Sequence, residues 1–298
     1  MRRMTSFMWD KVKRNKKYMA LVTAPLWIPC LLYALWLVVW MLAIDYFKIP
    51  TMSMVPTLQS GDEAFVNKMV IGARIYTDLH FKVTGQELKA FRLKGLRPPK
   101  RGDVVVFNFP HHEGRISFII NNVYCKRILA IGGDSISCKD GHYVNNNYEG
   151  KLGVKALQDQ LAQIPDTAIC SSTLHILPYE EHFKWTIRNF GPLYVPRKGD
   201  CINITPKEAV LYKMILEWET GERISWNWER GDVYVGGKRL ECHHFKHSYC
   251  FMAGDNVMDS NDSRYWGLVP EEYIVGVVQY TLHKDGKFVN ISMKEGED

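Results

Sequence analysis

Two serines and a lysine, far apart in this sequence, stand in settings that suit nucleophilic catalysis. Ser53 is the small nucleophile of the stretch Pro50 to Pro56, where a proline at each end restricts the backbone. Ser260 lies in a polar loop, residues 254–264, that is rich in Asp, Asn and Ser. Such loops often only hydrogen-bond to themselves, and a serine beside prolines often lies in a turn or in a core. These structural interpretations stay open on local evidence.

The lysine is unusual because of its neighbours. If residues 117–131 form a strand, Lys126 shares one face with Tyr124, Ile128 and Ala130. Lysine is rarely buried unless it is paired or has a task. An edge-strand lysine, or one whose stem is buried while its amine reaches water, is the alternative interpretation.

Together these residue types could carry out acyl transfer. A serine hydroxyl is a poor nucleophile and needs a base within hydrogen-bond reach. Lysine can be that base only when neutral, so its pKa must fall by roughly two to three units from about 10.4. Burial in an apolar pocket would lower it, and a nearby hydroxyl would suffice to aim the amine.

The charge of the chain is concentrated at its start. Residues 1–17 hold seven basic residues and one acidic residue, which accounts for the whole net charge of +6 over 298 residues. The remainder is balanced, so a nucleic-acid partner is not expected. The next 27 residues, 18–44, carry no charge and would span about 40 Å as a helix. They predict one uncleaved transmembrane helix with its N-terminus in the cytoplasm and all later residues outside.

Six of the seven cysteines follow this segment, and Cys30 lies within it. Six exterior cysteines allow up to three disulfides in fifteen pairings, between which the sequence does not choose. Cys242 and Cys250 bracket three histidines, but their spacing matches no common zinc pattern. A cross-linked hairpin or free thiols are therefore favoured there, and no metal and no cofactor are expected.

Short apolar runs bounded by Gly, Asp, Asn and Pro predict a mostly β chain. The expected strands are residues 64–66, 103–109, 117–131, 143–144, 232–235 and 273–282. Helical periodicity is convincing only in residues 154–164 and 206–219. The middle of the chain therefore suggests an inserted subdomain.

Four motifs in this order resemble those of the bacterial type I signal peptidases, which are membrane-bound Ser/Lys endopeptidases. They are SMVPTL at 53–58, RGDVVVF at 101–107, KRILAIGGD at 126–134 and GDN…SNDSRYWGLVP at 254–270. The resemblance implies a catalytic β domain, 45–136 and 252–298, with a second β-rich (α+β) domain, 137–251, inserted in it. The basic tail 1–17 and the transmembrane helix 18–44 precede it.

Carried onto this chain, the resemblance implies that Ser53 is the nucleophile and Lys126 the general base. Ser260 would orient the lysine amine, and Thr51 would supply an oxyanion donor beside the Ser53 backbone N–H. The family's structural ion pair in the last motif corresponds to Asp262 and Arg264.

The resemblance also implies small pockets for an Ala-x-Ala substrate, which would bind as an added strand. The expected lining residues are Ile49, Pro50, Val123 and Cys125. Met52, Met54, Val55 and Leu58 are expected to include groups that touch lipid. The chain departs from the family pattern in two places: Gly132 stands where proline is usual, and residues 257–259 lack the usual Arg and Asn. The first change should loosen its turn, and the second should alter the support of the Ser260 loop.

The sequence thus predicts a single-pass enzyme of the cytoplasmic membrane that removes signal peptides from exported preproteins through an acyl-enzyme. Its partners would be preproteins and the phospholipid bilayer, with the secretion machinery as a further candidate. One alternative is a conjugation-type maturation peptidase of the same superfamily, and another is a non-catalytic membrane-anchored binding protein. Intact Ser53, Lys126 and Ser260 argue against the second alternative.

Overall fold

The computed structural model describes residues 25, 27–77 and 88–291. The chain divides into two compact units, residues 1–44 and 45–298. In the first unit, residues 27–42 are helical and expose a series of large apolar side chains. Within the described residues, no helix is both long enough and apolar enough to cross a bilayer. The predicted segment 18–44 lies partly outside those residues, and the tail 1–17 lies wholly outside them.

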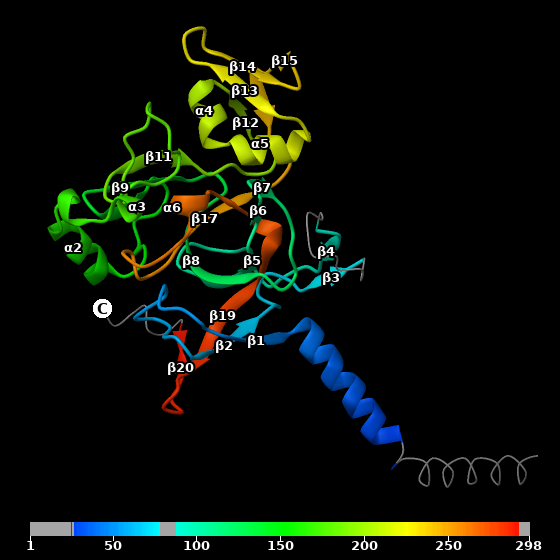
Figure 1. Cartoon of the computed structure of the whole chain (residues 1–298). Coiled ribbons are helices and arrows are strands. Elements are labelled where there is room, and N and C mark those ends of the chain that lie inside the picture. The colour runs from blue at the N-terminus through cyan, green and yellow to red at the C-terminus, as the bar shows by residue number, and fades with distance from the viewer. Residues whose placement is uncertain (1–24, 26, 78–87, 292–298) are drawn as a thin grey trace, which may run out of the picture. The chain divides into compact units, whose positions relative to one another are not determined.

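The largest sheet of the described residues has eight strands and carries most of the predicted motifs (Figure 1). Its order is β1-β2-β19-β5-β8-β17-β18, and β20 pairs with β19. The strands are β1 Ile44–Lys48, β2 Glu63–Asn67, β5 Val104–Asn108, β8 Val123–Ile131, β17 Tyr249–Ala253, β18 Val269–Pro270, β19 Ile274–Leu282 and β20 Phe288–Asn290. Strands from both ends of the sequence thus lie side by side in one sheet.

Both faces of this sheet are covered, which explains the continuous apolar run of β5. Val104 and Val106 belong to one buried apolar cluster, whereas Val105 and Phe107 belong to another. Successive side chains of a strand point to opposite faces, so the two clusters lie on opposite sides of the sheet. All five residues of β5 and all five of β17 are buried. These central strands are the frame on which the motif loops are placed.

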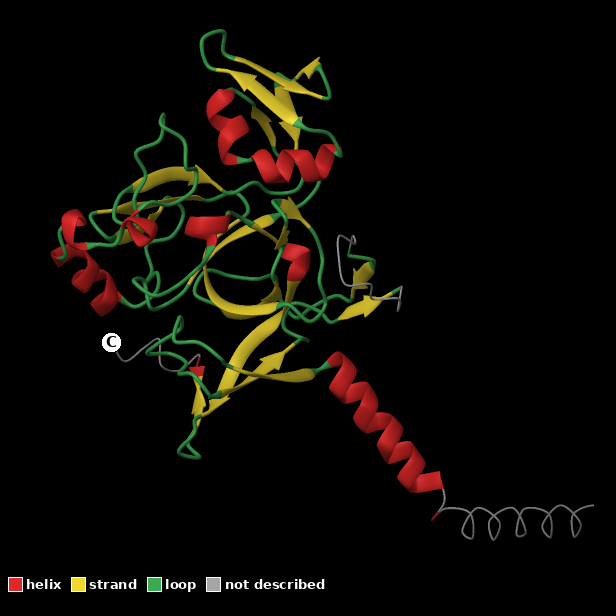
Figure 2. Ribbon diagram, in the orientation of Figure 1, coloured by secondary structure: helices red, strands yellow, loops and turns green. Residues whose placement is uncertain are grey.

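The remaining strands form small sheets, most of them in the segment between β8 and β17 (Figure 2). They are β3 Arg74–Tyr76, β4 Ala90–Arg92, β6 His111–His112, β7 Arg115–Ile116, β9 Ser135–Lys139, β10 His142–Asn145, β11 Phe190–Tyr194, β12 Cys201–Asn203, β13 Ile224–Asn227, β14 Asp232–Val235, β15 Lys238–Arg239 and β16 Cys242–His244. The helices are α2 Lys155–Gln163, α3 Ser171–Leu174, α4 Pro206–Leu211, α5 Lys213–Thr220 and α6 Ser263–Trp266.

Most predicted elements are present near their expected limits. The helix predicted at 206–219 is two helices, α4 and α5, with a break at Tyr212. The strand predicted from residue 117 begins only at Val123, because residues 117–122 make a turn in which the Asn122 N–H donates to the Ile119 carbonyl. The limits 136/137 and 251/252 of the predicted insertion fall inside β9 and β17. All seven cysteines are described, and all are free thiols.

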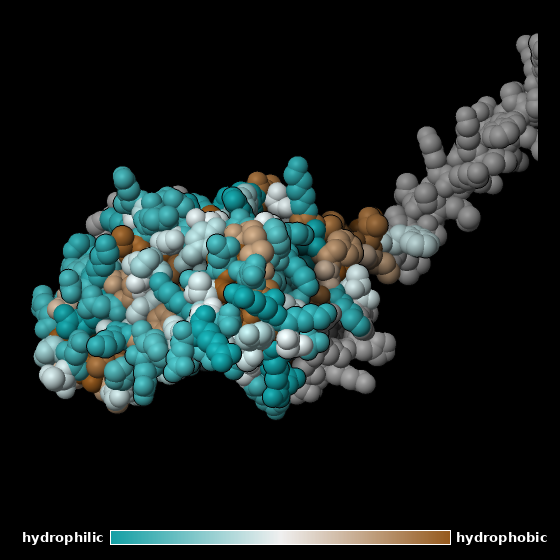
Figure 3. All heavy atoms as spheres, turned by 90° about the horizontal axis from the view of Figure 1, so that it is seen from above, coloured by the Kyte–Doolittle hydropathy of each residue, from teal (hydrophilic) through white to brown (hydrophobic). Residues whose placement is uncertain are grey.

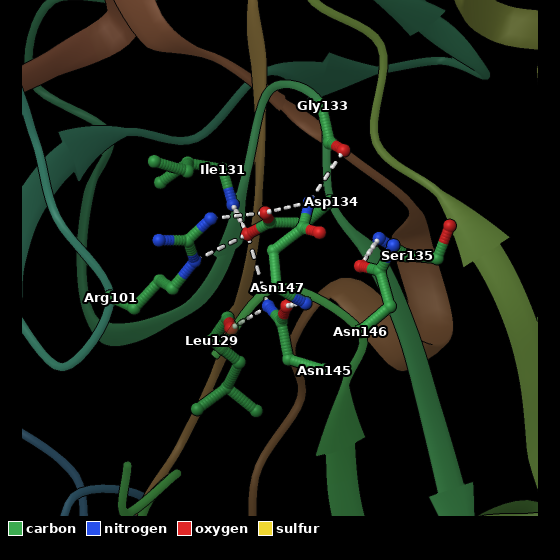
Figure 4. Close-up of polar contacts among 9 residues, drawn as sticks. All are labelled: Arg101, Leu129, Ile131, Gly133, Asp134, Ser135, Asn145, Asn146 and Asn147. Atoms are coloured by element: carbon green, nitrogen blue, oxygen red, sulfur yellow. Dashed lines mark hydrogen bonds and ion pairs between the residues drawn. The ribbon is translucent and has the colours of Figure 1, made fainter. Parts of the chain in front are cut away.

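A buried carboxylate joins the second and third motifs (Figure 4). Asp134, which follows β8, accepts a 2.7 Å hydrogen bond from Arg101 Nε and a 2.9 Å bond from the Ile131 N–H. Asn145 and Asn147 bond to the same carboxylate from the end of β10. The pKa of Asp134 is lowered although burial alone would raise it, because Arg101 and these amides stabilise the charged form. This network fixes the turn after β8 to the loop before β5.

Packing explains why a glycine stands at position 132 in this turn. A Cβ added at Gly132 would lie 2.9 Å from Arg197 Cβ and 3.0 Å from Arg197 Cα. Such a contact is too close, so a larger residue would require Arg197 to move. The glycine that departs from the family pattern therefore accommodates a residue of the segment between β11 and β12.

Candidate active site

The loop between β1 and β2 brings Ser53 to the middle of β8. Lys126 Nζ lies 2.5 Å from Ser53 Oγ, within hydrogen-bond reach, across 73 positions of sequence. Ser53 is 8% exposed and Lys126 is 3% exposed. The two residues that the sequence predicts to act together are thus in contact and largely shielded from water.

Burial has the electrostatic effect that a lysine base needs. Lys126 lies opposite Val105 of β5 in the sheet. The pKa of Lys126 is lowered from 10.5, first because burial penalises the charged ammonium, while the negative charge of Asp262 opposes the shift. The neutral amine that can take a proton from Ser53 is therefore favoured.

Thr51 stands beside the nucleophile. Its Oγ1 lies 3.3 Å from Ser53 Oγ, and the residue itself is exposed. The hydroxyl therefore lies close to the atom at which a bond to substrate would form. This position is compatible with the predicted oxyanion donor, a role that stays a prediction.

The loop after β17 holds the nucleophile from the other side. The Asn256 N–H donates a 3.1 Å hydrogen bond to the Ser53 carbonyl oxygen. A Cβ added at Gly254 would lie 2.4 Å from that oxygen and 2.2 Å from Ser260 Oγ. Only a glycine lets the strand end, the nucleophile's backbone and Ser260 come this close. Gly254 and Asn256 of the GDN motif therefore shape the site through the backbone.

Ser260 is buried beside Gly254. Its hydroxyl makes no hydrogen bond of ideal geometry within the described chain, but it lies close enough to the Asp262 carboxylate to help lower the pKa of that group. The predicted role of Ser260 in aiming the Lys126 amine stays a prediction.

Asp262 and Arg264 form a fully buried ion pair. Arg264 donates from Nε to Asp262 Oδ1 at 2.8 Å and from Nη2 to Oδ2 at 2.7 Å. The pKa of Asp262 is lowered despite burial, because the charge and hydrogen bonds of Arg264 stabilise the carboxylate. Arg264 Nη1 also donates to the Val257 carbonyl at 2.8 Å, so the arginine supports the segment in which the family pattern is changed.

A second buried ion pair was not singled out from the sequence. Arg127, which follows the lysine, donates to both carboxylate oxygens of Asp255 at 2.7 and 2.8 Å. It also donates to the Gly102 carbonyl at 2.8 Å, and Thr57 bonds to Asp255. These contacts join all four motifs. The available signal was a charged residue, Arg127, inside the otherwise apolar motif at 126–134.

A cavity of about 440 Å³ opens at the dyad. All four predicted lining residues border it: Ile49, Pro50, Val123 and Cys125. Met54, Tyr124, Asp259 and Asn261 also border it and were not predicted as lining residues. The arrangement places a cavity with several apolar lining residues next to a serine that has a lysine amine in contact.

The expectation that Met54 and Leu58 touch lipid is wrong. Met54 is 1% exposed and Leu58 is fully buried, and both pack in the cluster that contains Val104 and Val106. The loop folds back onto the sheet, so these side chains become core. Met52 is 47% exposed and remains on the surface.

A family model and several individual relatives all match this chain to signal peptidases. The family model described as "Signal peptidase, peptidase S26" matches residues 22–283. Signal peptidase I of Helicobacter pylori (strain J99) is 28% identical over 84% of this chain and 78% of the relative. Signal peptidase I of Buchnera aphidicola subsp. Baizongia pistaciae is 26% identical over 84% of this chain and 71% of the relative. Signal peptidase I of Aquifex aeolicus is 27% identical over 84% of this chain and 79% of the relative.

Proposed function

Because the chain belongs to the signal peptidase family, peptidase S26, we propose that it removes N-terminal signal peptides from exported preproteins after an Ala-x-Ala-type site. Its membership makes it a serine peptidase. The observation that carries the proposal for the catalytic mechanism is the 2.5 Å contact between Lys126 Nζ and Ser53 Oγ at the floor of the cavity.

In this mechanism Ser53 Oγ attacks the scissile carbonyl carbon while the neutral Lys126 amine takes its proton. The Thr51 hydroxyl and the Ser53 backbone N–H stabilise the oxyanion of the tetrahedral intermediate. The lysine proton passes to the leaving amine, the C–N bond breaks and an acyl-enzyme remains. Lys126 then takes a proton from the water molecule that attacks the ester carbonyl carbon. When the C–O bond to Ser53 breaks, Lys126 returns that proton to Ser53 Oγ, so the carboxylic acid is released and the neutral dyad is restored.

The sheet supports an extended substrate. Among the described residues, β17 pairs with β8 only from Arg127 to Ile131, so residues 123–126 have β5 on one side and no strand on the other. Val123 and Cys125 border the cavity beside this free edge. A peptide that adds there as a strand would present its carbonyl near Ser53, and alternate side chains would enter the cavity.

The membrane belongs to the same proposal. The uncharged residues 18–44 would anchor the chain, and the basic residues before them would remain in the cytoplasm. The unit 45–298 would then act on the exterior face, where a signal peptide emerges from the bilayer. The anchor would keep enzyme and substrate at high effective concentration.

Cleavage of a signal-peptide-bearing preprotein by the full chain in detergent tests the proposal. We expect Ser53→Ala and Lys126→Ala each to lower kcat/KM by more than about a hundredfold, since residues that act as a unit lose nearly all activity when one is removed. Lys126→Arg should lower kcat/KM to the same extent, because arginine stays protonated and cannot act as the base. Ser225→Ala and Lys238→Ala, exposed strand residues, are the matched controls. Residual activity above a hundredth in a folded dyad variant would contradict the assignment.

A further inference from the structure

Three potential metal ligands meet on the surface of the segment between β8 and β17. Cys201 lies on β12, and Cys242 and His244 lie on β16. One ligand atom of each residue, two sulfurs and one imidazole nitrogen, lies within 4.8 Å of the others. All three residues are exposed. The sequence did not suggest this set, because Cys201 is 41 positions away from Cys242 and the noted Cys250 is buried in β17.

The strand register explains why the three side chains converge. β12 and β16 are antiparallel, with Cys201 opposite His244 and Asn203 opposite Cys242. Residues two apart on a strand share a face, so Cys242 and His244 point to the same side as Cys201. His243 between them points the other way, where it is buried and bonds to Glu219 at 2.7 Å. The buried contact between His243 and Glu219 fixes which side chains of β16 point to each side of the strand pair.

The same register favours a metal ion over a disulfide. The two cysteines are diagonal partners, and diagonal Cα atoms on paired strands are roughly 7–8 Å apart. A disulfide usually requires about 4.4–6.8 Å between Cα atoms, so closing it would move the backbone. Two thiolates on one tetrahedral zinc ion need sulfurs only about 3.8 Å apart, given Zn–S bonds of about 2.3 Å. The two sulfur atoms already lie within 4.8 Å of each other.

We propose that Cys201, Cys242 and His244 form a binding site for a thiophilic divalent metal ion, with Zn²⁺ as the favoured occupant. Two thiolates and an imidazole are a usual zinc ligand set, and a solvent molecule completes the tetrahedron. The site is separate from the dyad cavity, with which it shares no residue, and it does not depend on the proposed peptidase function.

Such an ion would fasten two strands that join different parts of the fold. β12 leads into α4 and α5, and β16 leads into β17 of the large sheet (Figure 1). Their ladder spans only three residue pairs, Cys201 to Asn203 with Cys242 to His244. A metal bridge across so short a ladder would stabilise the two strands through which the chain enters and leaves the segment that forms α4, α5 and β13–β15.

Metal titration of the reduced full chain in detergent tests this site without any need for activity. We expect one Co²⁺ per chain with the absorption bands of tetrahedral thiolate coordination, displaced by Zn²⁺. Cys201→Ser, Cys242→Ser and His244→Ala should each weaken Zn²⁺ affinity by more than the roughly 10–100-fold that outer-shell changes cost. Cys170→Ser, which removes another exposed thiol, should bind as the unaltered chain does.

Alkylation followed by mass spectrometry gives a second readout. Bound Zn²⁺ should protect Cys201 and Cys242 from iodoacetamide while Cys170 reacts at its usual rate. Equal Zn²⁺ affinity in Cys201→Ser and the unaltered chain, or equal alkylation with and without Zn²⁺, would overturn the proposal. So would a metal-free Cys201–Cys242 disulfide in the protein as isolated.

Discussion

At the scale of single residues, the proposed catalytic role of Lys126 conflicts with the stability of the fold. The residue is almost fully buried and its pKa is lowered, first by burial. At a pH below this lowered pKa, folding must bury an ammonium that the unfolded chain keeps in water. The same burial makes it easier for the amine to lose its proton beside Ser53 Oγ. The proposed catalytic role of Lys126 would explain why a residue that destabilises the fold is kept there.

This conflict predicts that Lys126→Met is inactive but more stable. Between the folded pKa and 10.5 the unfolded state binds more protons than the folded state, so wild-type stability rises with pH through that window. The cost is full below the folded pKa and vanishes above 10.5. The Tm advantage of Lys126→Met should therefore be largest at low pH and should decline as pH rises.

Thermal unfolding of both proteins across pH checks this expectation. Lys238→Met, at an exposed position, is the control and should show no such trend. The kcat/KM of the unaltered enzyme should rise with pH as Lys126 loses its proton. Identical Tm values for Lys126→Met and the unaltered chain at every pH would contradict the account of a buried, disfavoured charge.

Thr51 carries a second prediction at this scale. If its hydroxyl stabilises the oxyanion, Thr51→Val should cost about 2.7–4 kcal/mol of transition-state stabilisation, seen mainly in kcat. Thr51→Ser keeps the hydroxyl, which lies 3.3 Å from Ser53 Oγ, and should stay close to normal activity. Steady-state kinetics on one preprotein measures both. An unchanged kcat in Thr51→Val would show that the hydroxyl makes no such contact.

At the scale of elements, the loop after β17 organises the site. It contains Asp255, which pairs with Arg127 of β8, and Asp262, which pairs with Arg264. Its Asn256 N–H holds the Ser53 carbonyl on the separate loop between β1 and β2. Neither member of the proposed Ser53–Lys126 dyad lies on the loop after β17. The loop nevertheless sets the distance between the two elements that carry them.

The Arg127–Asp255 pair predicts a large stability effect when broken on one side only. Asp255→Ala removes the carboxylate that accepts two hydrogen bonds from a guanidinium that is only 7% exposed, and we expect it to cost about 3–5 kcal/mol. Replacing both partners, Arg127→Met with Asp255→Leu, should recover much of that loss because neither position then carries a charge. Urea unfolding of the three proteins measures the differences.

A surface pair serves as the control. Arg239 and Asp232 are 3.2 Å apart with the arginine 62% exposed, so Asp232→Ala should cost no more than about 1 kcal/mol. If Asp255→Ala is no worse than Asp232→Ala, the buried pair does not hold the loop. If the double variant is as unstable as Asp255→Ala, the cost comes from lost packing.

At the scale of the whole molecule, residues 45–298 form one compact unit with its own core. The face seen in Figure 3 is mostly hydrophilic, with apolar side chains in scattered groups. Because Met54 and Leu58 are core residues, the apolar surface near Ser53 is smaller than the sequence suggested. The proposed membrane advantage should therefore come mainly from the anchor.

A truncated protein that begins at Ala43, which retains all of β1, tests this expectation. It should fold and should cleave a short soluble peptide at about the rate of the full chain, because the dyad lies within the compact unit. With a preprotein in phospholipid vesicles, the full chain should be markedly faster, since the anchor raises the effective concentration. The measurement is kcat/KM for both proteins with each substrate.

The two substrates serve as controls for each other. Equal rates on the vesicle-bound preprotein would show that residues 1–42 contribute nothing to the encounter. A truncated protein that is much slower on the soluble peptide as well would instead show that the removed residues support the site itself.

The sequence by itself determined the local chemistry and most of the elements. The apolar runs within residues 103–109 and 273–282 predict strands, since side-chain periodicity is a local property, and β5 and β19 lie within those limits. The motif residues singled out Ser53 and Lys126, and the resemblance they carry agrees with the family match. Turns at glycine and proline could be predicted without knowledge of distant residues, because these residues act on the local backbone.

Only the tertiary structure decided which distant residues meet. The Ser53–Lys126 contact joins residues 73 positions apart, and the Arg127–Asp255 pair joins residues 128 positions apart. No local pattern encodes such pairings, because they depend on strand order and register. The same reason explains the error at Met54 and Leu58, whose loop folds onto the sheet. It also explains the Cys201–Cys242–His244 cluster, which exists only because β12 pairs with β16 in one register.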